Sequence, residues 1–141
     1  MKKNSLLFLI CLCAGIFNSC KTEGTFNVED LNGQWTIISV KDEPIELENM
    51  PFFEFDMAEK KVHGYTGCNI LNSNLETDDN DKTAIKFFAP ISTMMACMNM
   101  DTETKILQVI GNITHVKKGE TSNRIKFVDK NENTMLLLEK S

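Results

Sequence analysis

Two cysteines, Cys68 and Cys97, constrain the fold of this chain more than any other feature of its sequence. Each stands among small and polar residues typical of turns, in the segments Gly64 to Asn69 and Ser92 to Cys97. The cysteines are 29 positions apart, and paired cysteines of exported proteins are usually oxidised. A disulfide closing a loop of that length would stabilise a small domain by about 3.5 kcal/mol, through the reduced entropy of the unfolded chain. The alternative is two free, buried thiols.

The N-terminal segment predicts export and lipidation rather than a part of the fold. Two lysines precede an apolar run from Leu6 to Ile16, which has the length of a signal-peptide core and is too short to cross a bilayer. The run ends at Phe17-Asn18-Ser19-Cys20, which resembles a bacterial lipobox, although a Phe replaces the usual Leu. We expect residues 1–19 to be removed, Cys20 to be lipidated and residues 20–30 to form a tether. Ordinary cleavage that leaves Cys20 free is the alternative.

A lipidated cysteine would hold the protein on a membrane surface without crossing the membrane. We therefore expect a location in the cell envelope, with a lipid anchor in the outer membrane. The domain would then face either the periplasm or the cell surface, and the sequence leaves both open.

The charge of the remaining chain disfavours nucleic acid as a partner. The whole chain of 141 residues has 15 basic and 20 acidic side chains, and loss of a leader with two lysines leaves a net charge of −7. Phosphate binding requires clustered Lys and Arg, and the sequence contains no such cluster. The length suffices for one domain, residues 31–141, which we expect to be monomeric.

Short segments of alternating apolar and polar residues predict a mainly β domain. In the first of them Trp35, Ile37 and Ser39 share one face, while Thr36, Ile38 and Val40 share the other. About eight strands are expected, within residues 31–40 and at 51–56, 61–65, 70–77, 83–88, 113–117, 124–128 and 135–139. Turn residues separate them at regular spacing, which predicts a small antiparallel, barrel-like domain.

One helix is expected late in the domain, at residues 101–110. The spacing of apolar residues changes in this segment to that of a helix, because Ile106, Val109 and Ile110 fall on one face. Asp101 is the expected N-cap, and Gly111-Asn112 is the expected C-terminal stop.

Three segments resemble the META domain family, which includes the HslJ-type heat-shock lipoproteins. They are Leu31-Asn32-Gly33-Gln34-Trp35, Val62 to Asn69, and Ser92 to Cys97. The resemblance implies a small β-barrel-like fold, an envelope or secreted location, and links to stress or drug tolerance. It implies no catalytic residues. The hairpin at residues 129–133 departs from the common Asp-Gly turn of the family, and there we expect an Asn in the left-handed conformation.

Methionines near Cys97 suggest a soft-metal site as an alternative function. Thioether and thiolate sulfurs select Cu(I), and His63 could add a nitrogen ligand. Methionine more often fills irregular gaps in a core, and a disulfide would remove the thiolate, so we expect no metal. The methionines concerned are Met94, Met95, Met98 and Met100.

The sequence offers little for catalysis. Its only histidines are His63 and His115, and it has neither a nucleophile elbow nor a glycine-rich phosphate loop. The acidic run at residues 78–81 lacks the Gly and the final Glu of a calcium loop and is expected to be a hairpin tip. We expect no enzyme activity and no cofactor.

The sequence therefore predicts a non-enzymatic binding or interaction module of the envelope, linked to envelope stress or drug tolerance. Its partner would be a small hydrophobic ligand or an envelope protein. The interaction surface is expected where the disulfide joins its two segments, at Gly64, Tyr65, Gly67, Asn69, Thr93 and Met94. The alternatives are a Cu(I)-binding lipoprotein with a Met/Cys cluster and a secreted inhibitor of another enzyme.

Overall fold

Alternating side chains produce the strands that the sequence predicts. In β5 (Ile70–Thr77), for example, Leu71, Ser73 and Leu75 are buried and the residues between them are exposed. The computed structural model describes residues 25–98 and 100–141, so the predicted signal peptide and Cys20 lie outside the described residues. In chain order the elements are η1 (Val28–Leu31), β1 (Gly33–Val40), β2 (Glu43–Pro44), β3 (Phe52–Asp56), β4 (Lys61–Tyr65), β5, β6 (Ile85–Phe87), β7 (Ile91–Ser92), α1 (Asp101–Ile110), β8 (His115–Lys118), β9 (Arg124–Val128) and β10 (Thr134–Lys140).

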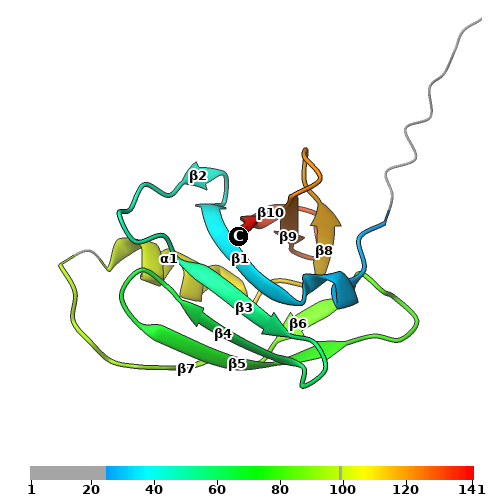
Figure 1. Ribbon diagram of the computed structural model, residues 1–141, viewed down its shortest axis with the longest axis horizontal. Coiled ribbons are helices and arrows are strands. Elements are labelled where there is room, and N and C mark those ends of the chain that lie inside the picture. Colours follow the sequence, from blue (N-terminus) through cyan, green and yellow to red (C-terminus); the bar gives the residue numbers. More distant parts are fainter. Residues whose placement is uncertain (1–24, 99) are drawn as a thin grey trace, which may run out of the picture.

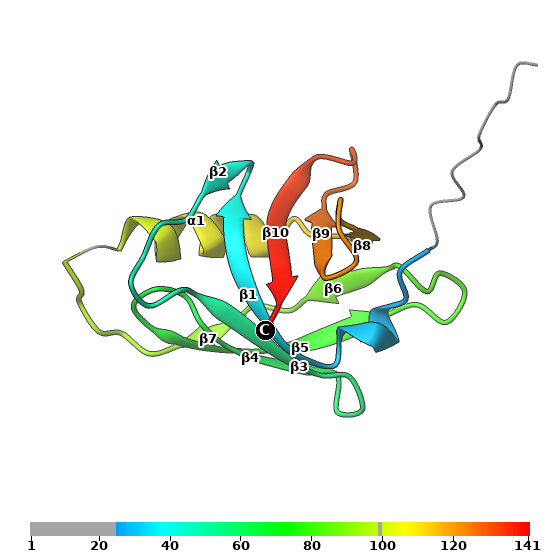
Figure 2. The same ribbon diagram turned by 45° about the horizontal axis from the view of Figure 1, so that its top comes forward.

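The strands form one antiparallel sheet that curls until its ends nearly meet (Figure 1). The order is β6-β5-β4-β3-β1-β10-β9-β8, while the short strands β2 and β7 pair with β1 and β5. An isolated bridge joins Ala84 to His115, and the Ile85 N–H donates to the Thr114 carbonyl at 3.0 Å. The helix α1 lies against β1 and β10 (Figure 2). The predicted barrel-like fold of about eight main strands with one inserted helix is confirmed.

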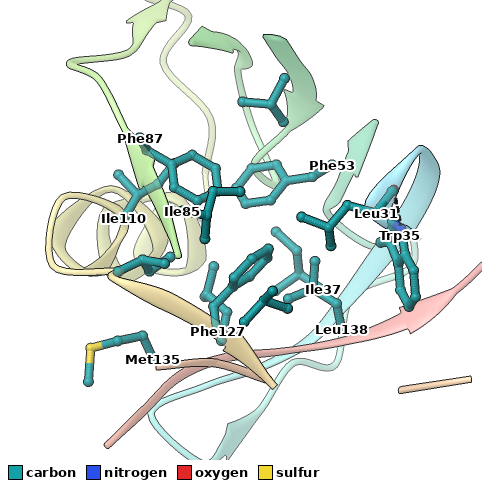
Figure 3. Packing of buried hydrophobic residues seen from close by; sticks show 14 of the residues in the cluster. Leu31, Trp35, Ile37, Phe53, Ile85, Phe87, Ile110, Phe127, Met135 and Leu138 are labelled. Carbon is teal, nitrogen blue, oxygen red and sulfur yellow. Dashed lines mark hydrogen bonds between the residues drawn. The ribbon is translucent and has the colours of Figure 1, made fainter. Parts of the chain in front are cut away.

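Packed side chains fill the interior of this barrel (Figure 3). Phe53, Phe55, Phe87 and Phe127 form an aromatic cluster with ring centroids 5.6 to 6.2 Å apart. Nearly all buried apolar residues from Val28 to Leu138 belong to one core, so the described residues form a self-contained folding unit. None of the helices in residues 25–98 and 100–141 has the length and apolar character needed to cross a membrane.

The domain begins earlier than predicted, which shortens the expected tether. Val28 and Leu31 of η1 are buried, and the Trp35 Nε1–H donates to the Leu31 carbonyl at 2.7 Å. Phe26 packs edge-on against the Trp35 ring. Residues 26–30 therefore belong to the domain, because they cover the large apolar surface of Trp35.

Local irregularities correct two other expectations and add one short strand. A register shift between Ile37 and Ser39 puts Val40 into the core with Ile37, although strict alternation would separate them. The first hairpin turns at Lys41 and Asp42, both at positive φ, so Glu43 and Pro44 already belong to a strand. In the last hairpin Glu132 takes the left-handed conformation, at φ 68°, rather than the expected Asn.

The ends of α1 also differ in detail from the prediction. Met100 is the N-cap and makes no side-chain cap bond, while Asp101 is the first helical residue. The carboxylate of Asp101 still lies in the first turn, where the helix dipole favours negative charge. Gly111 ends the helix as predicted, but with φ −72° rather than in the left-handed region.

Candidate interaction site

Exposed apolar side chains concentrate in one segment of the described chain. In residues 25–98 and 100–141, every large hydrophobic side chain that is exposed lies between positions 88 and 100. They are Phe88, Ile91, Met94, Met95, Met98 and Met100. Met94 and Met98 are essentially fully exposed, at 98% and 108%. A concentration of exposed apolar groups marks an interaction site more often than isolated ones do. We call Met94, Met95, Met98 and Met100 the methionine surface.

The backbone that carries this surface is anchored to the sheet at its N-terminal end. The two residues of β7 pair with Leu71 and Asn72 of β5. Beyond β7 the Thr93 N–H donates to the Ile70 carbonyl at 3.1 Å, and the Ile70 N–H donates to the Thr93 hydroxyl at 3.1 Å. The chain thus remains strand-like up to Thr93 and then leaves the sheet.

The side chain of Asn69 holds the next part of the loop. Its Oδ1 accepts from the Met95 N–H at 2.7 Å and from the Thr93 hydroxyl at 2.8 Å. Its Nδ2 donates to the Met95 carbonyl at 3.2 Å and to Glu103 Oε1 at 2.8 Å. All four hydrogen-bonding positions of the amide are therefore used, and the Met95 backbone is held from both sides.

The side chain of Asn69 is itself held by Glu103, which lies in the first turn of α1. Its carboxylate is buried, with 4% of the residue exposed, and accepts from the Thr66 hydroxyl at 2.6 Å and the Asn69 N–H at 2.7 Å as well as from the Asn69 amide. Burial raises the pKa of Glu103, but the hydrogen bonds from Thr66 and Asn69 outweigh it and keep the pKa below its ordinary value. The group is therefore an anion at neutral pH, and it links the helix to the loop.

Sequence reasoning missed Glu103, although a signal was present. An acidic residue near a helix N-terminus is common and usually exposed, so its type alone suggested nothing. Its position, however, is three residues before Ile106 and seven before Ile110, which places it on the buried face of the helix.

A disulfide closes the loop at its C-terminal end. Cys68 and Cys97 are bonded, with Cα atoms 5.9 Å apart, so the predicted pairing is present in the structure. Cys68 is buried beside Asn69, whereas Cys97 is exposed. The loop from Thr93 to Cys97 is thus held at Thr93, Met95 and Cys97, and the side chain of Met94 projects outward between these points.

The six predicted surface residues divide into two groups. Thr93 and Met94 are exposed, but Gly64 and Asn69 are buried and support the surface rather than belong to it. A β-carbon on Gly64 would lie 2.6 Å from the Phe52 carbonyl oxygen, which explains the glycine. Tyr65 and Gly67 are half-buried, and the Tyr65 hydroxyl donates to the Gly67 carbonyl at 2.7 Å.

The other predicted candidates lie away from a common centre. His63 Nδ1 is 2.9 Å from Asn72 Oδ1, and His115 Nε2 is 3.3 Å from Asp81 Oδ2. Among the described residues, no group of three or more His, Cys, Asp or Glu side chains could hold a metal ion. With both sulfurs in the disulfide, only thioethers remain as soft donors near Cys97.

An open hollow of about 730 Å³ lies on the outer face of β3, β4 and β5. Polar or charged residues such as Glu54, Lys61 and His63 share its lining with apolar residues such as Phe55, Val62 and Ile91, and more of its exposed surface is apolar than polar. The hollow thus offers both kinds of contact. The methionine surface differs from it in presenting several large, exposed apolar side chains along one segment, which makes it the better candidate for purely apolar contacts.

The fold and the site together describe a small β-barrel domain with one exposed, anchored loop. A nearly closed antiparallel barrel with one helix carries an exposed loop that a disulfide and a buried carboxylate hold in place. The model of the META domain family matches residues 27–141, and the chain belongs to this family.

A comparison with solved structures finds a similar fold. The chain is similar to a solved structure described as the NMR structure of the protein from Burkholderia xenovorans, with a TM-score of 0.61 and 17% sequence identity. The similarity covers 80% of this chain and 85% of that chain. At this level of identity the likeness concerns the fold alone. No functionally curated protein matches the chain.

Proposed function

We propose that this META domain protein is a non-enzymatic binding module of the bacterial envelope, and that its methionine surface contacts the partner. The observation that carries the proposal is the concentration of exposed apolar side chains between residues 88 and 100. Methionine side chains are flexible and polarisable, so they adapt to apolar partners of different shape. The family resemblance suggests that such binding serves tolerance of envelope stress or drugs.

The arrangement of polar groups favours binding over catalysis. Glu103 is the buried carboxylate of the site, and its hydrogen bonds to Thr66 and Asn69 leave it aimed at the protein itself rather than at solvent. Both cysteine sulfurs are occupied by the disulfide, which removes a thiolate nucleophile as well as a thiolate ligand for Cu(I). The copper alternative then depends on thioethers alone, and the inhibitor alternative is a special case of binding through the same loop.

The test of the proposed function is site-specific cross-linking in cells. A photo-reactive amino acid at position 94 is expected to give a discrete adduct, which disappears when Met95 and Met98 are replaced by Ser. The matched control is the same group at Lys130, an exposed residue in the hairpin between β9 and β10. Identical adducts from positions 94 and 130, or an adduct that persists without the two methionines, would contradict a binding role for this surface.

Lipid anchoring at Cys20 is part of the proposal and has its own test. Cys20→Ser is expected to move the protein from the membrane fraction to the soluble fraction, because a diacylated cysteine is the proposed means of attachment. Intact mass of the wild-type protein should show a chain that begins at Cys20 and carries acyl groups. A Cys20→Ser protein that stays in the membrane fraction would argue against the anchor, and the control Lys21→Ser should leave attachment unchanged.

A further inference from the structure

The end of the molecule that carries the methionine surface is bordered by acidic groups. Glu46 and Glu48 lie in the loop between β2 and β3, and Asp101 begins α1; all three are exposed. Gly67 connects these parts, since a β-carbon built on it would lie 3.4 Å from Leu47 Cδ1 and 3.6 Å from Thr102 Cβ. Figures 1 and 2 show the loop after β2 and the loop before α1 at the same end of the molecule.

Basic groups are scarce at this end. Among the described residues of the segments 44–51, 64–70 and 92–105, Lys105 is the one basic side chain. Its ammonium group lies 2.6 Å from Glu43 Oε2, and Asp101 also interacts with it electrostatically, so two acidic groups share this one cation. Lys86, farther back along the chain, lies over the Phe88 ring and pairs with Glu76. The methionine surface therefore has uncompensated negative charge beside it.

We infer that the partner of the methionine surface is a cationic amphipathic peptide, with apolar side chains on one face and Lys or Arg beside them. This inference rests on the proposed function and adds the chemistry of the partner. Apolar side chains would pack on the methionines, while basic groups would lie near Glu46, Glu48 and Asp101. An anionic lipid surface would meet repulsion instead, since the chain after the predicted leader has a net charge of −7.

The fixed backbone of the loop adds to this argument. Asn69 holds Met95, and the disulfide holds Cys97, so residues 93–97 have little backbone freedom to lose when a partner binds. The methionine side chains keep their own rotational freedom in the unbound protein, because they are exposed. A fixed backbone with adaptable side chains suits a family of related amphipathic sequences better than one rigid ligand.

The experiment uses residues 21–141, which contain the whole folding unit, and two synthetic helical peptides of about 18 residues, or five turns. One peptide has Leu on one face and Lys on the other, and its partner has Glu in place of Lys. Binding is measured by fluorescence anisotropy at low and at raised salt. We expect the Lys peptide to bind at least about tenfold more tightly than the Glu peptide, with an advantage that shrinks as salt rises.

Two sets of substitutions locate the contact. Met94→Ser, Met95→Ser and Met98→Ser together are expected to weaken binding of the Lys peptide by about tenfold or more. Glu46→Gln, Glu48→Gln and Asp101→Asn together should weaken it severalfold and reduce its salt dependence. The matched control removes three exposed acids elsewhere, with Glu29→Gln, Asp79→Asn and Glu120→Gln, and should leave affinity unchanged. Thermal unfolding checks that each variant remains folded.

The outcomes separate this inference from the proposed function. If the Glu peptide binds as well as the Lys peptide and both need the methionines, the cationic partner is wrong and the binding module stands. If neither peptide depends on the methionines, the inference fails, and cross-linking from position 94 decides the proposed function. Methionine-dependent binding to vesicles of anionic phospholipid without peptide binding would overturn the inference in favour of a membrane. Methionine-dependent self-association without peptide binding would overturn it in favour of a second copy.

Discussion

Replacement of both Cys68 and Cys97 by Ala is expected to lower the free energy of unfolding by about 3.5 kcal/mol. The disulfide closes a loop of 29 positions, and its loss would free the unfolded chain to adopt many more conformations. A loss of this size is a large share of the stability of a small domain. Urea denaturation of residues 21–141 measures it, and a reducing agent should produce nearly the same loss in the wild type.

The controls for this prediction follow from the cysteine content of the domain. Residues 21–141 contain no other cysteine, so a reducing agent should not change the stability of the Ala/Ala variant. Alkylation of the unfolded, unreduced wild type should add no mass, whereas alkylation after reduction should modify two thiols. Alkylation of the unfolded wild type without reduction would show that the disulfide is absent. An unfolding free energy that complete reduction leaves unchanged would show that the disulfide does not stabilise the fold.

Glu103→Gln is expected to destabilise the domain by about 3 kcal/mol, although the side chain keeps its size. Oε2 accepts from Thr66 and from the Asn69 N–H, and Oε1 accepts from the Asn69 amide. A glutamine must turn its NH₂ group toward one of these donors. Asn69 cannot rotate its amide in response, since Oδ1 accepts from Met95 and Thr93. The measurement is urea unfolding at neutral pH, with the exposed Glu120→Gln as a matched control that should change little.

The same substitution should change how stability depends on pH. Because the pKa of Glu103 is lowered in the folded protein, its contribution is present above the ordinary value of 4.5 and is lost as pH falls through the folded value. The stability difference between wild type and Glu103→Gln should therefore shrink in acid. A difference that stays constant from neutral pH to about pH 3 would mean that the carboxylate is not held as an anion.

The strands and the helix of this fold are largely predictable because their local pattern matches their place in the core. β5 shows this well, since its alternation survives intact and puts Leu71 and Leu75 inside. The helix was predicted in the right place, with its cap one residue off, because Ile106, Val109 and Ile110 repeat with its period. The disulfide between Cys68 and Cys97 was predictable from the expected location of the protein.

The methionines near Cys97 are exposed, although the sequence favours a role for them in the core, and binding at this segment stays a prediction. The segment around Met94 and Cys97 was expected to be the contact surface, and the exposed side chains lie there. The supporting residues were assigned wrongly, because Asn69 in a turn-like sequence looks exposed. Its burial depends on Glu103, which lies 34 positions later and meets it only in the folded molecule.

By itself, the sequence determined the period and the place of the eight main strands and of the helix, because these depend on neighbours within a few residues. It did not predict the short strands β2 and β7. Tertiary structure alone decided the register shift between Ile37 and Ser39, the hydrogen bond from the Val28 N–H to the Lys82 carbonyl and the pairing of Glu103 with Asn69. Each of these reflects contacts between distant segments. A buried carboxylate such as Glu103 is stable only when partners from another segment supply its hydrogen bonds. The sequence around Glu103 does not indicate which residues those partners are.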